Sequence, residues 1–168
     1  LAPRWMSLHG SAEDFFKTGD GLSMECAPID PRPSGTPAYV GCRIQHHKFA
    51  AETEVSIKPK GNEAAGMLLV KNEQRQYFLA VRPGEVALLL LGKGKAEVLA
   101  STKTETDGGK PVGLKAVSKG TTYDFYYRDA SSYGWRLLTA DVPAAHIASQ
   151  RGGFTGSTIG LAATSAPL

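Results

Sequence analysis

The sequence contains little cysteine: Cys26 and Cys42 are the only two among 168 residues. No CxxC motif occurs, and no group of cysteine and histidine has the spacing of a zinc site. A fold that depends on a framework of disulfides is therefore excluded. The two cysteines could pair if their strands are neighbours, but two buried thiols are the favoured interpretation.

Long hydrophobic runs and concentrated charge are also lacking. The longest apolar run, Val86 to Leu91, has the length of a strand and not the roughly 20 residues of a membrane helix. The formal net charge is only +3, and the lysines are spread along the chain without a basic cluster beside stacking aromatics. We therefore expect neither a membrane-spanning segment nor a nucleic-acid partner.

The beginning of the sequence lacks a recognisable targeting signal. Residue 1 is Leu rather than Met, and no charged segment followed by an apolar stretch and a cleavage site is present. We interpret the chain as a mature or excised segment that forms one domain, because 168 residues suffice for one sizeable core. The cellular location is not assigned by the sequence, with periplasmic or secreted favoured over cytoplasmic.

Alternation with a period of two is the dominant pattern in the sequence. In "KFAAETEVSIKP" (48–59) apolar and polar residues alternate, as expected for a strand with one buried face. Turn-forming pieces such as "RPGE" and "DASSYG" separate further strand-like segments. "PIDPRPSGTP" (28–37), with four prolines, is predicted to be an extended surface loop between two strands. Ten short strands without an amphipathic helix indicate an antiparallel sandwich. The expected strands lie within residues 21–27, 38–47, 48–59, 64–72, 76–82, 85–92, 95–102, 112–118, 121–129 and 134–142.

Four histidines raise the question of a metal site: His9, His46, His47 and His146. His46 and His47 are adjacent, and on a strand they would point to opposite faces, so one site could easily use only one of them. A buried, hydrogen-bonded histidine together with a surface histidine is the favoured interpretation. We predict no metal and no cofactor.

The acidic residues form no recognisable catalytic pair in the sequence. Asp107, Asp124, Asp129 and Asp141 are interpreted as turn or strand-edge residues. No GxSxG motif and no phosphate-binding glycine-rich loop before a helix is present. Nothing in the chain by itself indicates catalysis.

Aromatic residues are concentrated in "TTYDFYYRD" (121–129). Two interpretations are open: a platform on which a sugar ring stacks, or a core face of the kind that strands commonly present. The residues concerned are Tyr39, Tyr77, Tyr123, Phe125, Tyr126, Tyr127 and Trp135.

"RGGFTGSTIGLAATS" (151–165) places Phe154 between glycines. Gly152, Gly153 and Gly156 free the backbone either for a loop that presents the ring or for a bend that turns it into the core. From this stretch alone, the core position is favoured.

Several motifs together resemble one family. They are "PRWMSLHGSAEDFF", "VGCRIQHHKFAAETEVSI", "EAAGMLLVKNEQRQYFLAVR", "YDFYYRDASSYGWRLL" and "GGFTGSTIGLAATS". In this order they are similar to the C-terminal β-sandwich domain of glycoside hydrolase family 43 β-xylosidases and α-L-arabinofuranosidases. The most specific are the strand with Arg43, Gln45 and His46 and the "GGFTG" motif.

The resemblance implies an all-β fold, an antiparallel two-sheet jelly roll of the concanavalin A type. It also implies an N-terminal five-bladed β-propeller that carries the catalytic acids, so this chain would not be catalytic alone. By the same resemblance, Phe154 closes one side of the sugar pocket on that propeller. Gly152, Gly153, Thr155 and Gly156 would shape its loop, and the substrate would be an oligosaccharide derived from xylan or decorated with arabinose. An independent carbohydrate-binding module and a purely structural docking domain are the alternatives.

Two departures from the family pattern concern structure. Family members commonly have a double arginine where this chain has Cys42-Arg43. They also usually continue after "ATS" into a last strand. If that strand is missing, an exposed sheet edge would invite association, and a homo-oligomer is then expected.

Overall fold

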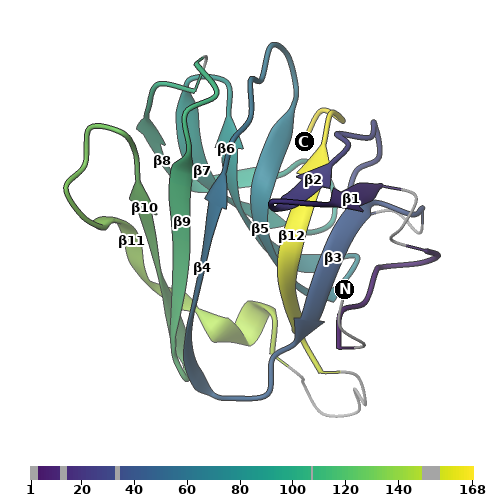
Figure 1. Cartoon of the computed structure of the whole chain (residues 1–168). Coiled ribbons are helices and arrows are strands. Elements are labelled where there is room, and N and C mark those ends of the chain that lie inside the picture. Colours follow the sequence, from purple (N-terminus) through teal and green to yellow (C-terminus); the bar gives the residue numbers. More distant parts are fainter. Residues whose placement is uncertain (1–3, 12–14, 33–34, 107, 149–155) are drawn as a thin grey trace.

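The computed structural model describes residues 4–11, 15–32, 35–106, 108–148 and 156–168, and it shows two facing antiparallel sheets (Figure 1). The larger sheet contains, in spatial order, β3 (Ala38–Arg43), β12 (Thr158–Thr164), β5 (Ala64–Asn72), β6 (Arg75–Arg82), β7 (Glu85–Leu91) and β8 (Glu97–Lys103). The smaller sheet contains β11 (Arg136–Pro143), β10 (Thr122–Arg128), β9 (Val112–Lys119) and β4 (Lys48–Val55). A separate hairpin consists of β1 (Phe16–Thr18) and β2 (Leu22–Met24).

This arrangement confirms the predicted sandwich. The segment 38–47 differs from the prediction, because β3 ends at Arg43 and leaves His46 and His47 in the loop before β4. β12 was not predicted as a strand, although it lies between the edge strand β3 and β5 in the larger sheet. The described residues include one short 3-10 helix, η2 (Ala144–His146), and no helix long and apolar enough to cross a membrane.

The main core lies between the two sheets. It is built by alternate residues of the larger sheet, such as Leu69, Leu79 and Leu88, which face Leu114 and Phe125 of the smaller sheet. All five side chains are fully buried. Burial of this apolar surface is the main source of stability in a sandwich.

The outer face of the larger sheet is buried as well. Phe78, Leu89 and Leu91 belong to a second apolar cluster on that face, with Leu8 and Leu168 packed against it. Loop segments also cover this face, since the buried side-chain amide of Gln76 donates to the carbonyl of Pro31 (3.1 Å). The proline-rich segment 28–37 does connect two strands as predicted, but Pro31 and Pro37 are buried.

The outer face of the smaller sheet is polar and charged. Lys115 pairs with Glu52 and Arg128 pairs with Glu54, each at 2.8 Å. The half-buried ring of Trp135 lies next to both cations, with its centroid 5.4 Å from Lys115 Nζ and 4.8 Å from the Arg128 guanidinium carbon. Cation–π contacts and ion pairs therefore organise this face where the larger sheet has apolar packing.

The cysteines are both free thiols. Cys26 and Cys42 are half-buried, so the prediction of buried thiols is only partly confirmed. Burial, followed by the negative charges of Glu63 and Glu25, raises the pKa of Cys26. A thiol with a raised pKa is a weak nucleophile at neutral pH.

Candidate functional site

One end of the sandwich brings together the two most specific motifs of the sequence. Thr158 at the start of β12 pairs in register with Arg43 at the end of β3. The amide of Ile44 donates to the carbonyl of Ser157 (2.9 Å). A Cβ added at Gly156 would lie 3.2 Å from the Arg43 guanidinium, so little space separates that loop from β3. The arginine strand and the end of the "GGFTG" motif are therefore neighbours.

Most of the predicted site lies outside the described residues. The site residues that the structure does not describe are Gly152, Gly153, Phe154 and Thr155. The pocket role of Phe154 therefore stays a prediction. Gly156 is described and half-buried. The described residues on the two sides of the segment, Ala148 and Gly156, both line one hollow in the surface.

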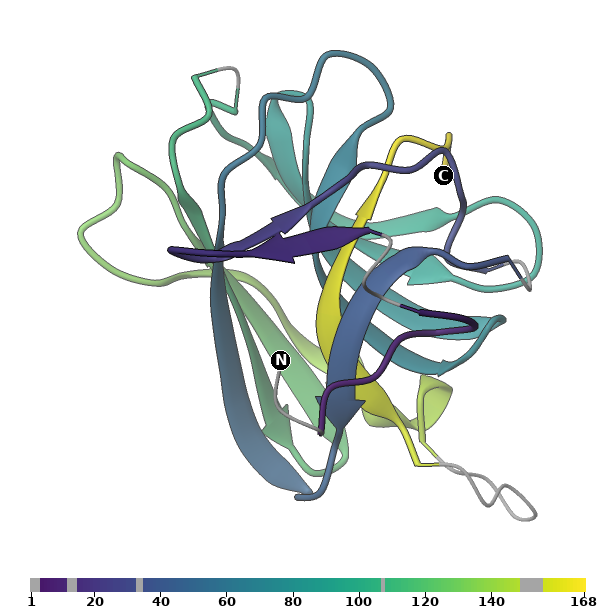
Figure 2. The same ribbon diagram turned by 45° about the vertical axis from the view of Figure 1, so that its right-hand side comes forward.

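This hollow, which we call the loop-end hollow, has a volume of about 340 Å³. That volume is at the lower end of the range for small-molecule pockets. Its lining residues lie where β3 leads into β4 and around η2, at the end of the sandwich that is at the bottom of Figure 2. Its lining residues are Ile44, Gln45, His46, His47, Ser118, Gly120, Tyr123, Ala144, Ile147, Ala148, Gly156 and Ser157.

Specific hydrogen bonds hold the walls of the loop-end hollow. The Tyr77 hydroxyl donates to the carbonyl of Pro143 (2.8 Å), and Arg75 Nη2 donates to the carbonyl of Ala145 (2.6 Å). The ring of His146 lies against that of Tyr77, with 5.1 Å between centroids. β6 therefore fixes η2 against the larger sheet. On the opposite wall, Ser118 Oγ donates to the carbonyl of His47 (2.6 Å) and ties the β3–β4 loop to β9.

The polar groups at the rim of the hollow are available to a ligand or a partner. Gln45, His46 and His47 are exposed, and their side chains form no hydrogen bond or ion pair with another described residue. Burial raises the pKa of Tyr123, and a hydrogen bond with Ser118 opposes the rise, so its hydroxyl stays protonated at neutral pH. The exposed amide and imidazole groups of Gln45, His46 and His47 can bind sugar hydroxyls or main-chain groups.

The histidine prediction is corrected in one respect. His46 and His47 both lie in a loop and are exposed, so neither is the buried, hydrogen-bonded histidine of that prediction. His146 is half-buried, and burial lowers its pKa. Among the described residues, no three side chains of His, Cys, Asp or Glu gather as a metal ion would require.

Three of the four aspartates considered in the sequence, Asp124, Asp129 and Asp141, have structural partners. Lys119 Nζ contacts Asp124 at 2.8 Å and Asp141 at 3.0 Å. Asp124 is buried within β10, so its prediction as a turn or strand-edge residue is wrong. Asp141 does lie on the edge strand β11, Asp129 follows β10 in a turn, and Asp107 lies outside the described residues. Burial by itself would raise the pKa of Asp124, but the hydrogen bonds from Lys119 and from the amide of Asp141 lower it.

The aromatic residues decide between the two interpretations of the sequence. The rings of Tyr39, Tyr77, Tyr123 and Tyr127 are buried. Tyr123 packs edge-on against Phe49 in the main core, 6.1 Å between centroids. The hypothesis of a sugar-stacking platform is therefore wrong for these four tyrosines, and the core interpretation is confirmed for them and for Phe125. Tyr126 and Trp135 are only half-buried and do not belong to the core.

The anchors Arg75 and Tyr77 were not identified from the sequence. They occupy strand positions, and their partners are main-chain carbonyls about 70 residues away, which carry no signature in the sequence. The signal that could have identified them is the presence of a guanidinium and a hydroxyl group near the start of the otherwise apolar strand β6.

Two packed antiparallel sheets, with loops that form a hollow at one end, define an antiparallel β-sandwich domain. The family model described as the β-xylosidase C-terminal concanavalin A-like domain matches residues 1–167, and the chain belongs to this family.

Relatives support the same assignment. A xylosidase/arabinosidase of Butyrivibrio fibrisolvens is 27% identical over 98% of this chain and 33% of its own length. A GH43_12 protein from a capybara gut metagenome superposes with a TM-score of 0.86 at 23% sequence identity. The match covers 98% of this chain and 32% of that protein. The GH43 protein BlXynB of Bacillus licheniformis superposes with a TM-score of 0.85 at 18% sequence identity. The match covers 100% of this chain and 34% of that protein. This chain thus spans about a third of the length of these relatives.

Proposed function

We propose that this chain is the accessory C-terminal domain of a family 43 glycoside hydrolase, and that it packs on the catalytic propeller of the same protein with its loop-end hollow. The observation that carries the proposal is the proximity of the Arg43 strand to Gly156, the last residue of the "GGFTG" motif, beside this hollow. The length of the relatives supports it too, since about two thirds of each lies outside the matched region.

In this proposal, Phe154 completes the sugar pocket of the propeller. The described residues on the two sides of its segment, Ala148 and Gly156, both line the hollow. An apolar ring at that place would exclude water and limit the pocket to a terminal sugar, as an exo-acting enzyme requires. The substrates would be short oligosaccharides derived from xylan or decorated with arabinose, in line with the xylosidase/arabinosidase relative.

The test is Phe154→Ala in the full-length enzyme. We expect kcat/KM on short xylosides or arabinosides to fall at least tenfold, which corresponds to about 1.4 kcal/mol of lost transition-state stabilisation. The matched control is Tyr133→Ala, because Tyr133 is a fully exposed aromatic in the β10–β11 loop at the other end of the sandwich (Figure 1).

Three results would count against the proposal in different ways. Unchanged kcat/KM in Phe154→Ala would remove the pocket role. Docking of the domain on the co-expressed propeller without any change in activity would leave only a scaffold. Oligosaccharide binding by the isolated chain in calorimetry would instead favour an independent carbohydrate-binding module.

A further inference from the structure

The four sheet edges of the sandwich differ in how they are protected. On β3, Met6 covers the edge by exchanging two backbone hydrogen bonds with Gly41 (2.8 and 2.9 Å). The pairing of β8 with β7 is broken by an irregularity between Leu88 and Leu89, and that of β11 with β10 by two. Such features make edge strands poor templates for another strand.

The fourth edge, β4, has none of these protections among the described residues. It pairs with β9 over its full length without a shift in register, and no described strand pairs with its other side. Its inward side chains, such as Ala51, Thr53 and Val55, are only half-buried, whereas their partners Leu114 and Ala116 on β9 are fully buried. One flank of β4 is therefore open.

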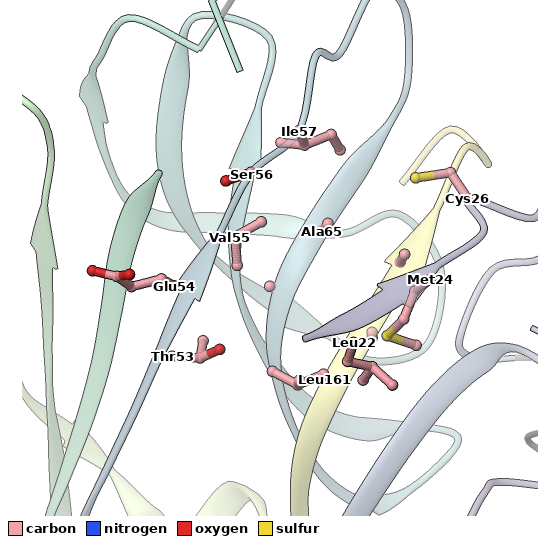
Figure 3. Close-up of a pocket in the computed structure, with 13 residues that line it drawn as sticks. Leu22, Met24, Cys26, Thr53, Glu54, Val55, Ser56, Ile57, Ala65 and Leu161 are labelled. Carbon is pink, nitrogen blue, oxygen red and sulfur yellow. The ribbon is translucent and has the colours of Figure 1, made fainter. Parts of the chain in front are cut away.

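An apolar groove runs beside this open flank. Figure 3 shows Thr53, Val55 and Ile57 on one side and Leu22 and Met24 of the hairpin on the other. Its volume is about 130 Å³. A strand added to β4 would cover the groove with its inward side chains, because successive side chains of a strand point to opposite faces.

We propose that a second copy of this chain occupies the edge, with the two β4 strands antiparallel about a twofold axis at Ala51. This places Lys48 of each copy opposite Glu54 of the other. Two opposite-charge pairs then form in one isologous interface. Lys48 has no ion pair to a described residue of its own chain, so its charge is available.

The pattern of β4 disfavours two of the neighbouring registers. A slip of one residue would place outward charged residues opposite inward apolar ones, since the side-chain period is two. A slip of two residues towards the C-terminal end would place Glu52 opposite its own copy, where like charges repel. With Ala51 on the axis, Ala50 and Ala51 also leave room for the strands to approach.

Sedimentation velocity on the 168-residue chain and on the full-length protein tests the proposal, which does not rest on the proposed function. We expect a concentration-dependent dimer of the 17.8 kDa chain. Lys48→Glu places like charges together twice and should weaken the dimer at least tenfold, and Glu54→Lys should do the same. Mixing the two variants restores both attractive pairs, so a heterodimer should form.

Lys95→Glu is the matched control, because Lys95 is exposed in the loop before β8 and the charge change is identical. Hydrogen exchange of the β4 amides that point away from β9 should slow as the concentration rises. The proposal is overturned by a monomer at all concentrations, or by a dimer that Lys48→Glu leaves intact. It is overturned equally if these outward amides are protected in the monomer, because another segment would then cover the edge.

Discussion

The two sheets of the sandwich share one core but depend on different interactions outside it. The larger sheet is apolar on both faces, with Phe78 and Leu89 fully buried on the outer side. The smaller sheet buries one face and presents ion pairs such as Lys115–Glu52 on the other. The larger sheet is therefore stabilised mainly by burial, and the outer surface of the smaller sheet remains open to solvent and to partners.

The difference is visible in the sequence of the strands. "EVALLLL" (85–91) is almost continuously apolar, as in a strand covered on both faces, whereas "KFAAETEV" (48–55) alternates. The six residues Val86 to Leu91 are buried or half-buried, while the residues of β4 alternate between exposed and half-buried. A continuous apolar run thus indicates that the outer face of the strand is covered as well as its inner face.

Replacing an aromatic ring on the outer face of each sheet should give the largest difference in stability between the two sheets. Phe78→Ala removes a fully buried ring and leaves a cavity, so we expect the free energy of unfolding to fall by about 3–5 kcal/mol. Tyr126→Ala removes a half-buried ring on the smaller sheet and should cost about 1 kcal/mol. Urea unfolding followed by circular dichroism measures both. Equal losses would show that the smaller sheet is also covered on its outer face.

Adding one methyl group between strands should give an intermediate effect. A Cβ at Gly160 of β12 would overlap the Val40 carbonyl oxygen and the Gly41 Cα, so Gly160→Ala forces backbone movement and should cost about 1–3 kcal/mol. A Cβ at Gly113 of β9 would meet the Trp135 ring at 3.0 Å, and that side chain can move. We therefore expect less than about 1 kcal/mol for Gly113→Ala. A larger loss there would mean that the Trp135 ring is held as firmly as a strand.

Acid should have the smallest effect on stability, and this effect involves Asp129, which follows β10 of the smaller sheet. Hydrogen bonds from Ser131, Ser132 and Thr104 lower the pKa of Asp129 from 3.8 to about 2, although burial opposes the shift. Because the folded chain binds this proton less readily than the unfolded chain, the contribution is complete above about pH 4. It is lost as the pH falls towards 2.

Asp129→Asn removes that contribution. We expect less than about 1 kcal/mol at pH 7, since the group is largely solvated. The variant should also lose part of the pH dependence of unfolding between pH 4 and 2. Asp20→Asn, at an exposed turn position, is the control. An unchanged slope in Asp129→Asn would show that its hydrogen bonds do not persist in solution.

The alternating strands of the sandwich could be predicted from the sequence, and the exceptions have physical causes. "IGLAATS" has no strict alternation because both faces of β12 are covered, with Ile159 packed against the main core and Ala162 in the outer apolar cluster, so it was not predicted as a strand. Residues 44–47 continue the alternation of β3, but the chain must leave one sheet for the other there, which ends the strand at Arg43.

The candidate site was predictable only as motifs. Family resemblance pointed to Arg43 and the "GGFTG" segment, and the pairing of β3 with β12 brings the described parts of both together. The hollow itself depends on Tyr77 and Ser118, whose hydrogen bonds to Pro143 and His47 join segments far apart in the chain. No local pattern encodes such contacts. The role of Phe154 remains a prediction for the full-length enzyme.

The placement of the two tryptophans determines what optical methods will report. Trp135 lies beside Lys115 and Arg128 on the smaller sheet, and Trp5 precedes the Met6 residue that covers β3. Neither indole belongs to the buried clusters. Tryptophan emission therefore reports on the periphery of each sheet, whereas near-ultraviolet signals of the buried tyrosines report on the core. A difference between the two optical transitions would reveal loosening of the surface before the sandwich opens.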